Sequence, residues 1–542
     1  MVSAPHLLTD PFLQLPTTNS VQVVWFTEFA GQEHVVYYGE NLDQSRLAKT
    51  SKLSRTREDQ QSKVANTTIN QPVKRHIWRH AAEVTGLTPG VRVPYFVMSV
   101  REDGASVRSD VFTLATTPER GQAMKILLTS DHQLKPMIAA NLQKVVETVG
   151  QIDGVWFAGD LINVSDRASE WFDDHRGGAF FPALQGRANY KMAHNGVETI
   201  YTGGEIIQHA PMFTAIGNHE VMGRVGRSNS LNNEFNDTIP RAVAEKLYRG
   251  KSLIDNSFNT QTYEEIFSLP ESESGGKKYY AVSFGDVRLV VLYVTCMWRT
   301  QKINTVYRGR YTEAVQDLDN PENWGYGQFI FEPIAKGSEQ YNWLEAELDS
   351  EEFQQAKYKV VMFHHPPHTL GDNIVPAYTD PVQTIERDHK GKITAVRYEY
   401  PKDTDYINRD LVPLLEAAEV QLVLYGHSHL WNRFISPSGM QFLETSNVGN
   451  SYGAAWGNNK REILTVSQED YIAVGDPYGL EPVVPSIAPL LREDNQPIPY
   501  IASNDITVFS IFNTGTGIVT SYYFDMRKPD SDVVKFDEFK LK

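Results

Sequence analysis

The first 118 residues alternate between short apolar segments and turn residues. Residues 20–25 alternate polar and apolar side chains with a period of two, which is typical of a half-buried strand. Residues 60–71 are polar without a period and predict a loop. Further short strands are predicted at 34–38, 77–84, 95–100 and 111–115. Strands of this length and spacing predict an N-terminal β-sandwich.

From residue 119 onward, after a polar linker, the pattern changes to strands that alternate with helices. Apolar strands are predicted at 124–128, 154–157, 212–216, 287–294, 358–363 and 420–425. Helical periodicity is present at 135–149, 339–348 and 411–418. Two more strand patterns lie near the end of the chain, at 506–512 and 518–524. This alternation predicts an α/β domain over residues 119–542.

Composition and charge narrow the class of protein. The chain has 542 residues, of which 41% are hydrophobic and 22% charged, as in ordinary globular proteins. Its 51 Lys and Arg against 67 Asp and Glu give a formal net charge of −16, so binding to a nucleic-acid backbone is not expected. The single cysteine, Cys296, excludes an intramolecular disulfide. We see no signal peptide and no bilayer-spanning apolar run, and expect a cytoplasmic protein without membrane contact, although a removed signal would leave the same sequence.

Short polar clusters follow five of the predicted strands. Loops at the carboxyl ends of strands converge on one edge of an α/β sheet, so these clusters are expected to meet there. Asp, Asn, Gln and His are ligands for hard and borderline divalent metals. One Gly-His-X-His sequence alone would be weak evidence, whereas five such clusters strongly indicate a metal site. They are Asp131-His132-Gln133, Gly159-Asp160, Gly217-Asn218-His219-Glu220, His364-His365-Pro366 and Gly426-His427-Ser428-His429.

The order of these clusters, over about residues 124 to 432, resembles the calcineurin-like metallophosphoesterase superfamily. A β-sandwich in front of them is similar to the layout of purple acid phosphatases. Residues 84–90 resemble a turn of fibronectin type III domains, although Val93 stands where those domains usually have tyrosine. The resemblance implies a fibronectin type III-like sandwich over residues 1–118. It also implies a calcineurin-like αββα sandwich as the catalytic domain over residues 119–542.

The resemblance further implies a site for two metal ions that share Asp160. A hydroxide bridging the two ions would attack phosphorus in line. His219 resembles the family residue that stabilises the transition state or protonates the leaving oxygen. We expect an acidic group to orient His219, with the adjacent Glu220 as one candidate that could also point elsewhere. The implied ligands are Asp131, Gln133, Asp160 and His429 for one ion, and Asp160, Asn218, His364 and His427 for the other.

Two residues depart from the purple enzymes. Asn163 stands where those enzymes carry the tyrosine whose charge transfer gives their colour, so we expect a colourless protein and disfavour Fe(III). Gln133 stands where many members have histidine, and its neutral oxygen favours manganese over zinc. We therefore expect two divalent ions, with manganese favoured and zinc or iron as alternatives.

These implications predict a hydrolase acting on phosphoric esters, with a small-molecule phosphate ester as its substrate. A phosphomonoesterase is the first choice, because the two-domain layout resembles acid phosphatases. A phosphodiesterase or nucleotide hydrolase is the alternative, because the same centre serves all these reactions. A binding or adhesion protein with a vestigial esterase domain is the non-enzymatic alternative. The complete set of ligands argues against it.

Three insertions, at 166–210, 371–405 and 445–505, match no motif. The first carries aromatic residues and arginines that could form a cleft wall for a base or sugar and for phosphate. A small separate core with a solvated face is the interpretation we slightly favour. The second could be a lid, and residues 449–457 of the third could lie near the mouth of the site. The residues in question are Trp171, Phe172, Phe180, Phe181 and Tyr190, with Arg167, Arg176 and Arg187.

Overall fold

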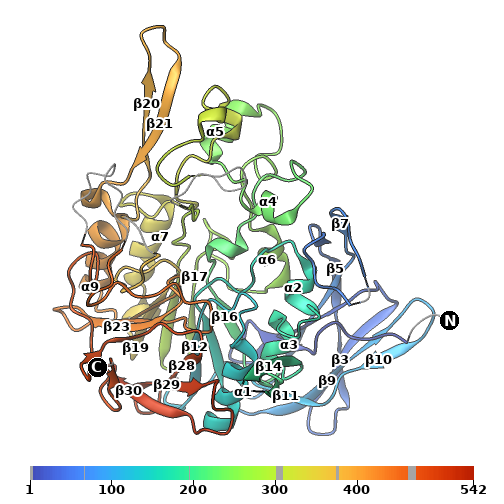
Figure 1. Ribbon diagram of the computed structural model, residues 1–542. Helices are drawn as coiled ribbons and strands as arrows, with labels where there is room; N and C mark the ends of the chain where they lie inside the picture. The colour runs from blue at the N-terminus through green and yellow to red at the C-terminus, as the bar shows by residue number, and fades with distance from the viewer. Residues whose placement is uncertain are drawn as a thin grey trace.

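The computed structural model describes residues 4–65, 67–194, 196–300, 309–373, 377–461, 472–492 and 494–542. Its N-terminal part is built from two antiparallel sheets that pack face to face (Figure 1). One sheet has the order β1 (Phe12–Gln14), β2 (Ser20–Thr27), β8 (Trp78–Thr85) and β5 (Lys49–Lys52). The other has the order β10 (Ser106–Arg108), β9 (Val93–Val100), β3 (Glu33–Tyr38) and β4 (Gln44–Leu47), with β11 (Phe112–Leu114) on β9. The predicted sandwich is therefore present.

Strand β2 is buried on both of its faces. Val23 and Trp25 point into the core between the two N-terminal sheets, where they meet Tyr95 and Val97 of β9. Because successive side chains alternate, the side chain of Phe26 points the other way. It packs against rings of the second domain, with centroid distances of 5.0 Å to Phe172 and 5.6 Å to Phe181. The two domains thus share apolar surface.

The second domain contains two larger sheets packed against each other. The first has the order β16 (Met212–Thr214), β13 (Gly154–Phe157), β12 (Lys125–Thr129), β28 (Ile506–Asn513), β29 (Ile518–Asp525) and β30 (Val534–Lys540). The second has the order β17 (Tyr280–Phe284), β18 (Val287–Val291), β19 (Tyr358–Met362), β22 (Leu422–Tyr425), β24 (Gln441–Thr445), β23 (Trp431–Ile435) and β27 (Tyr500–Ile501). Phe512 of one sheet meets Tyr358 of the other at a ring distance of 5.2 Å.

Helices cover the outer faces of these two sheets, which completes the predicted αββα arrangement. α1 (Ile138–Val149) lies on the first sheet, where Asn141 donates hydrogen bonds to Thr507 and Val508 of β28. α7 (Glu339–Leu348), α8 (Glu351–Gln354) and α9 (Val412–Ala417) bury apolar side chains against the second sheet. No helix within the described ranges is long and apolar enough to cross a membrane.

The shorter elements lie in the connections and insertions. The connections hold β6 (Arg57–Glu58), β7 (Val73–Lys74), α4 (Leu231–Phe235), α5 (Arg241–Leu247) and α6 (Gln261–Ile266). The first insertion holds α2 (Ala168–Phe172), α3 (Phe180–Leu184), β14 (Tyr190–His194) and β15 (Val197–Tyr201). The third holds β25 (Leu490–Leu491), β26 (Pro497–Ile498) and the edge strand β27. Its residues 462–471 and 493 lie outside the described ranges.

The structure refines several predicted elements. The helix predicted from residue 135 begins at Ile138, and the chain before it forms turns in which Lys135 N–H donates to His132 O and Ile138 N–H to Lys135 O. The second insertion forms a hairpin of β20 (Val382–Arg387) and β21 (Ile393–Glu399) that projects from the body (Figure 1). The predicted domain boundary at residue 118 falls between β11 and β12 and stays a prediction.

Candidate metal centre

Both large sheets deliver side chains to one place. Asp131, Asp160 and Asn218 follow the parallel strands β12, β13 and β16 of the first sheet. His364 and His427 follow the parallel strands β19 and β22 of the second. All five side chains are buried. The carboxyl ends of the two sheets therefore converge as expected.

The backbone is strained at these positions. Asp131, Asp160, His427 and His429 have φ values of 56°, 58°, 81° and 57°, in the left-handed region that residues other than glycine rarely adopt. Each such residue costs on the order of 1–3 kcal/mol unless the surrounding structure compensates. Strain at this many neighbouring residues is typical of a functional site.

Two glycines allow the loops to approach one another. A Cβ at Gly217 would collide with the backbone and carboxylate of Asp160. A Cβ at Gly426 would collide with Ser130 and with the Asp131 carboxylate. Glycine is the one residue that permits this packing, so the sequence motifs include Gly for steric reasons.

The predicted ligand side chains face one another. His364 Nε2 lies 3.3 Å from Asp160 Oδ2 and 3.2 Å from His427 Nδ1. His429 Nε2 lies 3.4 Å from Asp131 Oδ1. Gln133 Nε2 donates to Asp160 Oδ2 at 2.8 Å. Asp160 is thus in contact with groups of both predicted ligand sets, as a shared ligand would have to be.

Backbone carbonyls orient three of the histidines. His364 Nδ1 donates to Ala158 O at 2.8 Å, and His429 Nδ1 donates to Asn450 O at 3.0 Å. His219 Nδ1 donates to Asn163 O at 2.7 Å. A hydrogen bond of this kind selects the tautomer and leaves Nε2 directed at the site.

The residues fit a metal centre, because several of their buried oxygen atoms accept no hydrogen bond from the described residues. Asp131 Oδ1, Gln133 Oε1 and Asn218 Oδ1 are buried, and none of the described residues donates a hydrogen bond to them. Buried oxygen atoms without a partner are costly, and a cation satisfies them. Ligand atoms of Asp131, Asp160 and His364 lie within 4.8 Å of one another. The donor set, oxygens with imidazole nitrogens, suits divalent ions of the manganese, iron and zinc type.

Among the described residues, no acid meets the Nδ1 atom of His219, whereas the Asp160 carboxylate lies 3.9 Å from its Nε2. Its ring is oriented by the carbonyl of Asn163 instead. The Glu220 carboxylate turns away and accepts hydrogen bonds from the backbone N–H groups of Asp160, Leu161 and Gly217 at 2.9, 2.8 and 2.7 Å. Glu220 therefore joins the two loops that carry Asp160 and Asn218. Burial and the charge of Asp160 raise the pKa of Glu220 to about 8.

At the centre, Asp160 and the neighbouring histidines shift one another's pKa values. Burial opposes ionisation of Asp160, but the nearby charges of His364 and His219 hold the pKa of this carboxyl below its usual range. Burial likewise disfavours the charged form of His364. The attraction of the facing Asp160 carboxylate is stronger than this effect and raises the pKa of His364. These interactions keep Asp160 in its anionic form, which a shared metal ligand requires.

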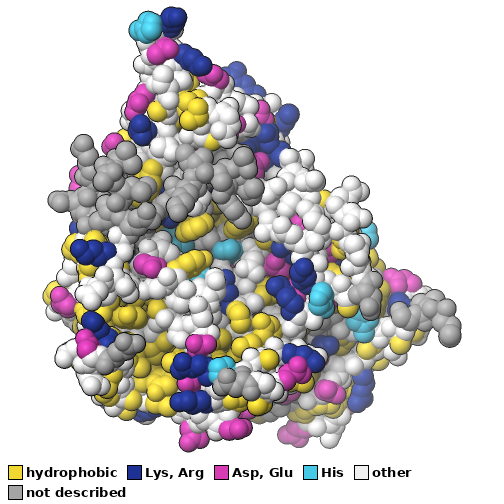
Figure 2. Space-filling model, viewed as in Figure 1, with side chains coloured by type: hydrophobic (Ala, Val, Ile, Leu, Met, Phe, Trp, Pro, Cys, Tyr) yellow, Lys and Arg dark blue, Asp and Glu magenta, His cyan; other side chains and the backbone are white. Residues whose placement is uncertain are grey.

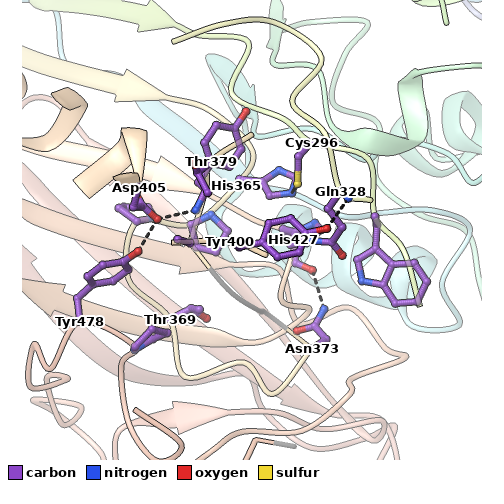
Figure 3. A pocket seen from close by; sticks show the side chains of 16 residues that line it. Cys296, Gln328, His365, Thr369, Asn373, Thr379, Tyr400, Asp405, His427 and Tyr478 are labelled. Atoms are coloured by element: carbon purple, nitrogen blue, oxygen red, sulfur yellow. Dashed lines mark hydrogen bonds between the residues drawn. The ribbon is translucent and has the colours of Figure 1, made fainter. Parts of the chain in front are cut away.

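Neighbouring histidines have packing roles. The His365 ring stacks on His427 with a centroid distance of 4.0 Å, and its Nε2 lies 3.2 Å from Cys296 Sγ (Figure 3). The His365 ring thus packs against His427, and ring nitrogens of His364, His365 and His427 all lie within 4.8 Å of one another. His132 packs on Phe157, and burial lowers the pKa of His132 to about 3.

A cavity of about 900 Å³ opens over the centre. Figure 2 shows histidine side chains in a hollow in the middle of this face. Aromatic rings line it: Phe235 stacks on His219, and Tyr452 packs at a tilt against His429, each with a centroid distance of 5.0 Å. Tyr452 belongs to the segment 449–457 that we expected near the mouth. Trp298 lies between this cavity and the smaller pocket of Figure 3.

The first insertion matches neither of its two interpretations in full, since its aromatic residues form neither a cleft wall nor a separate core. Its aromatic residues Trp171, Phe172, Phe180 and Phe181 are buried in the main core and do not line the cavity. Arg167 and Arg176 do line the cavity, but each is paired with carboxylates.

Sequence reasoning missed several residues around the site. Phe235, Trp298 and the N-terminal residues Gln60, Gln61 and Lys63 also line the cavity. No motif marks them, because they come from connections far apart in the chain. Only the polarity of the predicted loop at 60–71 was visible beforehand.

Comparisons with known proteins agree with this geometry. The family model for the calcineurin-like phosphoesterases matches residues 124–430. The solved structure of purple acid phosphatase PPD1 from yellow lupin (Lupinus luteus) seeds is similar to this one. The match covers 99% of this chain and 74% of the lupin chain, with 14% sequence identity and a TM-score of 0.55. At this identity, the structural match shows a shared fold alone. Matches to astrotactin-2 and to a Yersinia enterocolitica family 28 exopolygalacturonase have TM-scores of 0.13 and carry no argument. No curated protein matches the sequence.

Fold and site together define a metallohydrolase of the two-sheet αββα type. The chain belongs to the calcineurin-like phosphoesterase family, whose model spans more than half of its length. It is therefore a hydrolase of phosphoric esters, and its family implies divalent metal ions in a binuclear centre.

Proposed function

We propose that this protein is a binuclear, metal-dependent phosphomonoesterase with a preference for manganese. The observation that carries the proposal is the set of buried, unpartnered oxygens of Asp131, Gln133 and Asn218 around Asp160, at the floor of an open cavity. The oxygen donor of Gln133 supports manganese over zinc. The proposed ligand sets are Asp131, Gln133, Asp160 and His429 for one ion, and Asp160, Asn218, His364 and His427 for the other.

Bound there, two divalent ions would supply Lewis acidity, which activates water and neutralises charge on the phosphate. The chain's own residues supply orientation and a proton. His219 Nε2 lies 3.9 Å from Asp160 Oδ2 and faces the cavity side of the centre. Because His219 Nδ1–H donates to Asn163 O, Nε2 is the ring nitrogen that can take up a proton and then pass it to a leaving oxygen.

The substrate is proposed to be a small phosphate ester in the cytoplasm. A cavity of about 900 Å³ exceeds the size of a phosphate group, so a leaving group of some size fits, and a diester is the second candidate. The net charge of −16 argues against long nucleic acids as substrates.

The test measures metal content and hydrolysis together. Purified protein is stripped with a chelator, resupplied with manganese, zinc or iron, and assayed on p-nitrophenyl phosphate and on bis-(p-nitrophenyl) phosphate. We expect about two ions per chain, the highest monoesterase activity with manganese, and loss of ion binding and activity in Asp160→Ala. Absence of metal rescue on either ester would contradict the proposal, and a preference for the diester would replace it with the second candidate.

A further inference from the structure

The N-terminal domain contacts the catalytic domain through the strand β6 and the residue after it. Arg57 donates to Asp166 Oδ2 at 2.8 Å and pairs with Glu234 at 2.7 Å. Glu58 Oε2 accepts from Ser169 Oγ at 2.8 Å. These contacts fix the segment that follows Asn163, the residue whose carbonyl orients His219.

Asp59, next in the chain, is completely buried and does not line the cavity. Its two carboxylate oxygens accept from Arg167 Nη2 at 3.1 and 3.2 Å, and Oδ2 also accepts from the backbone N–H of Leu231 at 2.7 Å. The Asp59 carboxylate thus holds the guanidinium of Arg167, a residue 108 positions away in the other domain.

Arg167 connects Asp59 to Glu170, which lies closer to the site. Its Nη1 donates to Glu170 Oε1 at 2.7 Å. The other oxygen of Glu170 accepts from the backbone N–H groups of Asn163 and Val164 at 2.7 and 3.0 Å. The carbonyl of Asn163 then accepts from His219 Nδ1 at 2.7 Å. The bonds from Asp59 to Arg167 and on to Glu170 are buried, those at Asn163 N and O are partly buried, and each is a direct hydrogen bond.

We infer that Asp59 of the N-terminal domain is a positioning residue for His219. It acts through Arg167 and Glu170, which set the position of the Asn163 carbonyl and thereby the direction of His219 Nε2. The N-terminal domain then contributes to the orientation of an active-site residue. The inference rests on the proposed function of His219.

Other ion pairs between the domains do not lead to His219. Arg55 pairs with Asp255, and also donates to Gln261 on α6. The Arg55–Asp255 pair is more exposed than the Arg167–Asp59 pair, with 13% and 42% of its side chains exposed against 6% and 0%. Arg55→Gln removes an interdomain contact without touching the chain of hydrogen bonds from Asp59, and serves as the interdomain control.

The experiment is a double-mutant cycle on the full-length, metal-loaded protein, with p-nitrophenyl phosphate as the probe. Asp59→Asn is expected to lower kcat about 10- to 100-fold, the usual effect of losing an outer orienting partner, with KM and metal content unchanged. In a His219→Ala background, Asp59→Asn should cause no further loss, because its effect passes through the missing ring. Arg55→Gln should keep the wild-type kcat.

Several results would overturn the inference. One is a wild-type kcat in Asp59→Asn while His219→Ala is impaired, which leaves the proposed role of His219 intact. Another is the same loss in both backgrounds, or a loss of metal, since either indicates a general structural effect. A wild-type kcat in His219→Ala would overturn the role of His219 itself and the inference with it. If Asp59→Asn does not fold, Glu170→Gln tests the same connection, with the same outcomes deciding.

Discussion

At the scale of single residues, the candidate centre is built from buried side chains whose oxygen and nitrogen atoms face one another. The oxygens of Asp131, Gln133 and Asn218 are buried and unpartnered among the described residues, while the neighbouring histidines are oriented through Nδ1. Of these residues, Gln133 is the one whose chemistry separates metals, since an amide oxygen and an imidazole nitrogen differ in their preference.

Gln133→His should therefore shift metal selectivity toward zinc. After chelation and dialysis against equal concentrations of manganese and zinc, the zinc fraction bound per chain should rise relative to wild type, as measured by elemental analysis. Gln383→His, on the exposed hairpin strand β20, introduces the same side chain away from the site and should leave the ratio unchanged. An unaltered ratio in Gln133→His would exclude this residue as a ligand.

At the scale of elements, β3 and β8 bring two histidines together inside the N-terminal sandwich. The rings of His34 and His80 stack with a centroid distance of 3.5 Å. Hydroxyls of Thr27 and Thr50 bond to both nitrogens of His80, at 2.8 and 2.9 Å. Burial, with the charges of His34 and Arg79, lowers the pKa of His80 to about 2, and burial also lowers the pKa of His34.

This pair should make the sandwich sensitive to acid. The unfolded chain takes up protons near pH 6.5, the ordinary pKa of histidine, whereas folded His80 does not until about pH 2. Stability is therefore complete above pH 6.5 and falls as the pH is lowered, by about 3 kcal/mol from His80 alone at pH 4.5. Denaturant titrations from pH 7.5 to 4.5 measure this loss.

His80→Gln should flatten the pH dependence, whereas replacement of the exposed His6 by Gln should not. A slope that is equally steep in wild type and His80→Gln would show that other groups are responsible.

At the scale of the whole molecule, the two domains share one apolar core. Leu8, Phe12 and Phe26 of the N-terminal domain belong to the same cluster of buried side chains as the interior of the αββα sandwich. The ion pairs along β6 add polar contacts to this interface. Such a continuous core predicts that the domains unfold together.

Phe26→Ala should lower the free energy of unfolding by about 3–5 kcal/mol, the usual cost of removing a buried phenylalanine. Unfolding followed by tryptophan fluorescence and by residual phosphatase activity should coincide in both wild type and variant. Phe96→Ala removes a half-buried ring of the sandwich that stacks on Tyr37 instead, and should cost less. Two separate transitions in wild type would contradict a shared core.

Much of the architecture was predictable because it depends on local patterns. Period-two alternation marked β2, and continuous apolar runs marked β12, β13, β19 and β22. Each of these parallel strands ends in a polar cluster, so convergence of Asp131, Asp160 and His427 followed from the topology alone. The hairpin at 382–399 was not predicted, because β20 is exposed along its whole length and β21 buries only Val396 and Tyr398, in a small cluster apart from the main core.

The sequence by itself determined which residues could bind metal, since ligand chemistry and strand order are both encoded locally. Only the tertiary structure decided what orients them. His219 has a backbone carbonyl as its partner where an acid was expected, and Glu220 holds backbone instead of the ring. Asp59 reaches the site through Arg167 across 108 positions of sequence. Contacts of that kind depend on how two domains pack, and no periodicity or spacing within either segment specifies them.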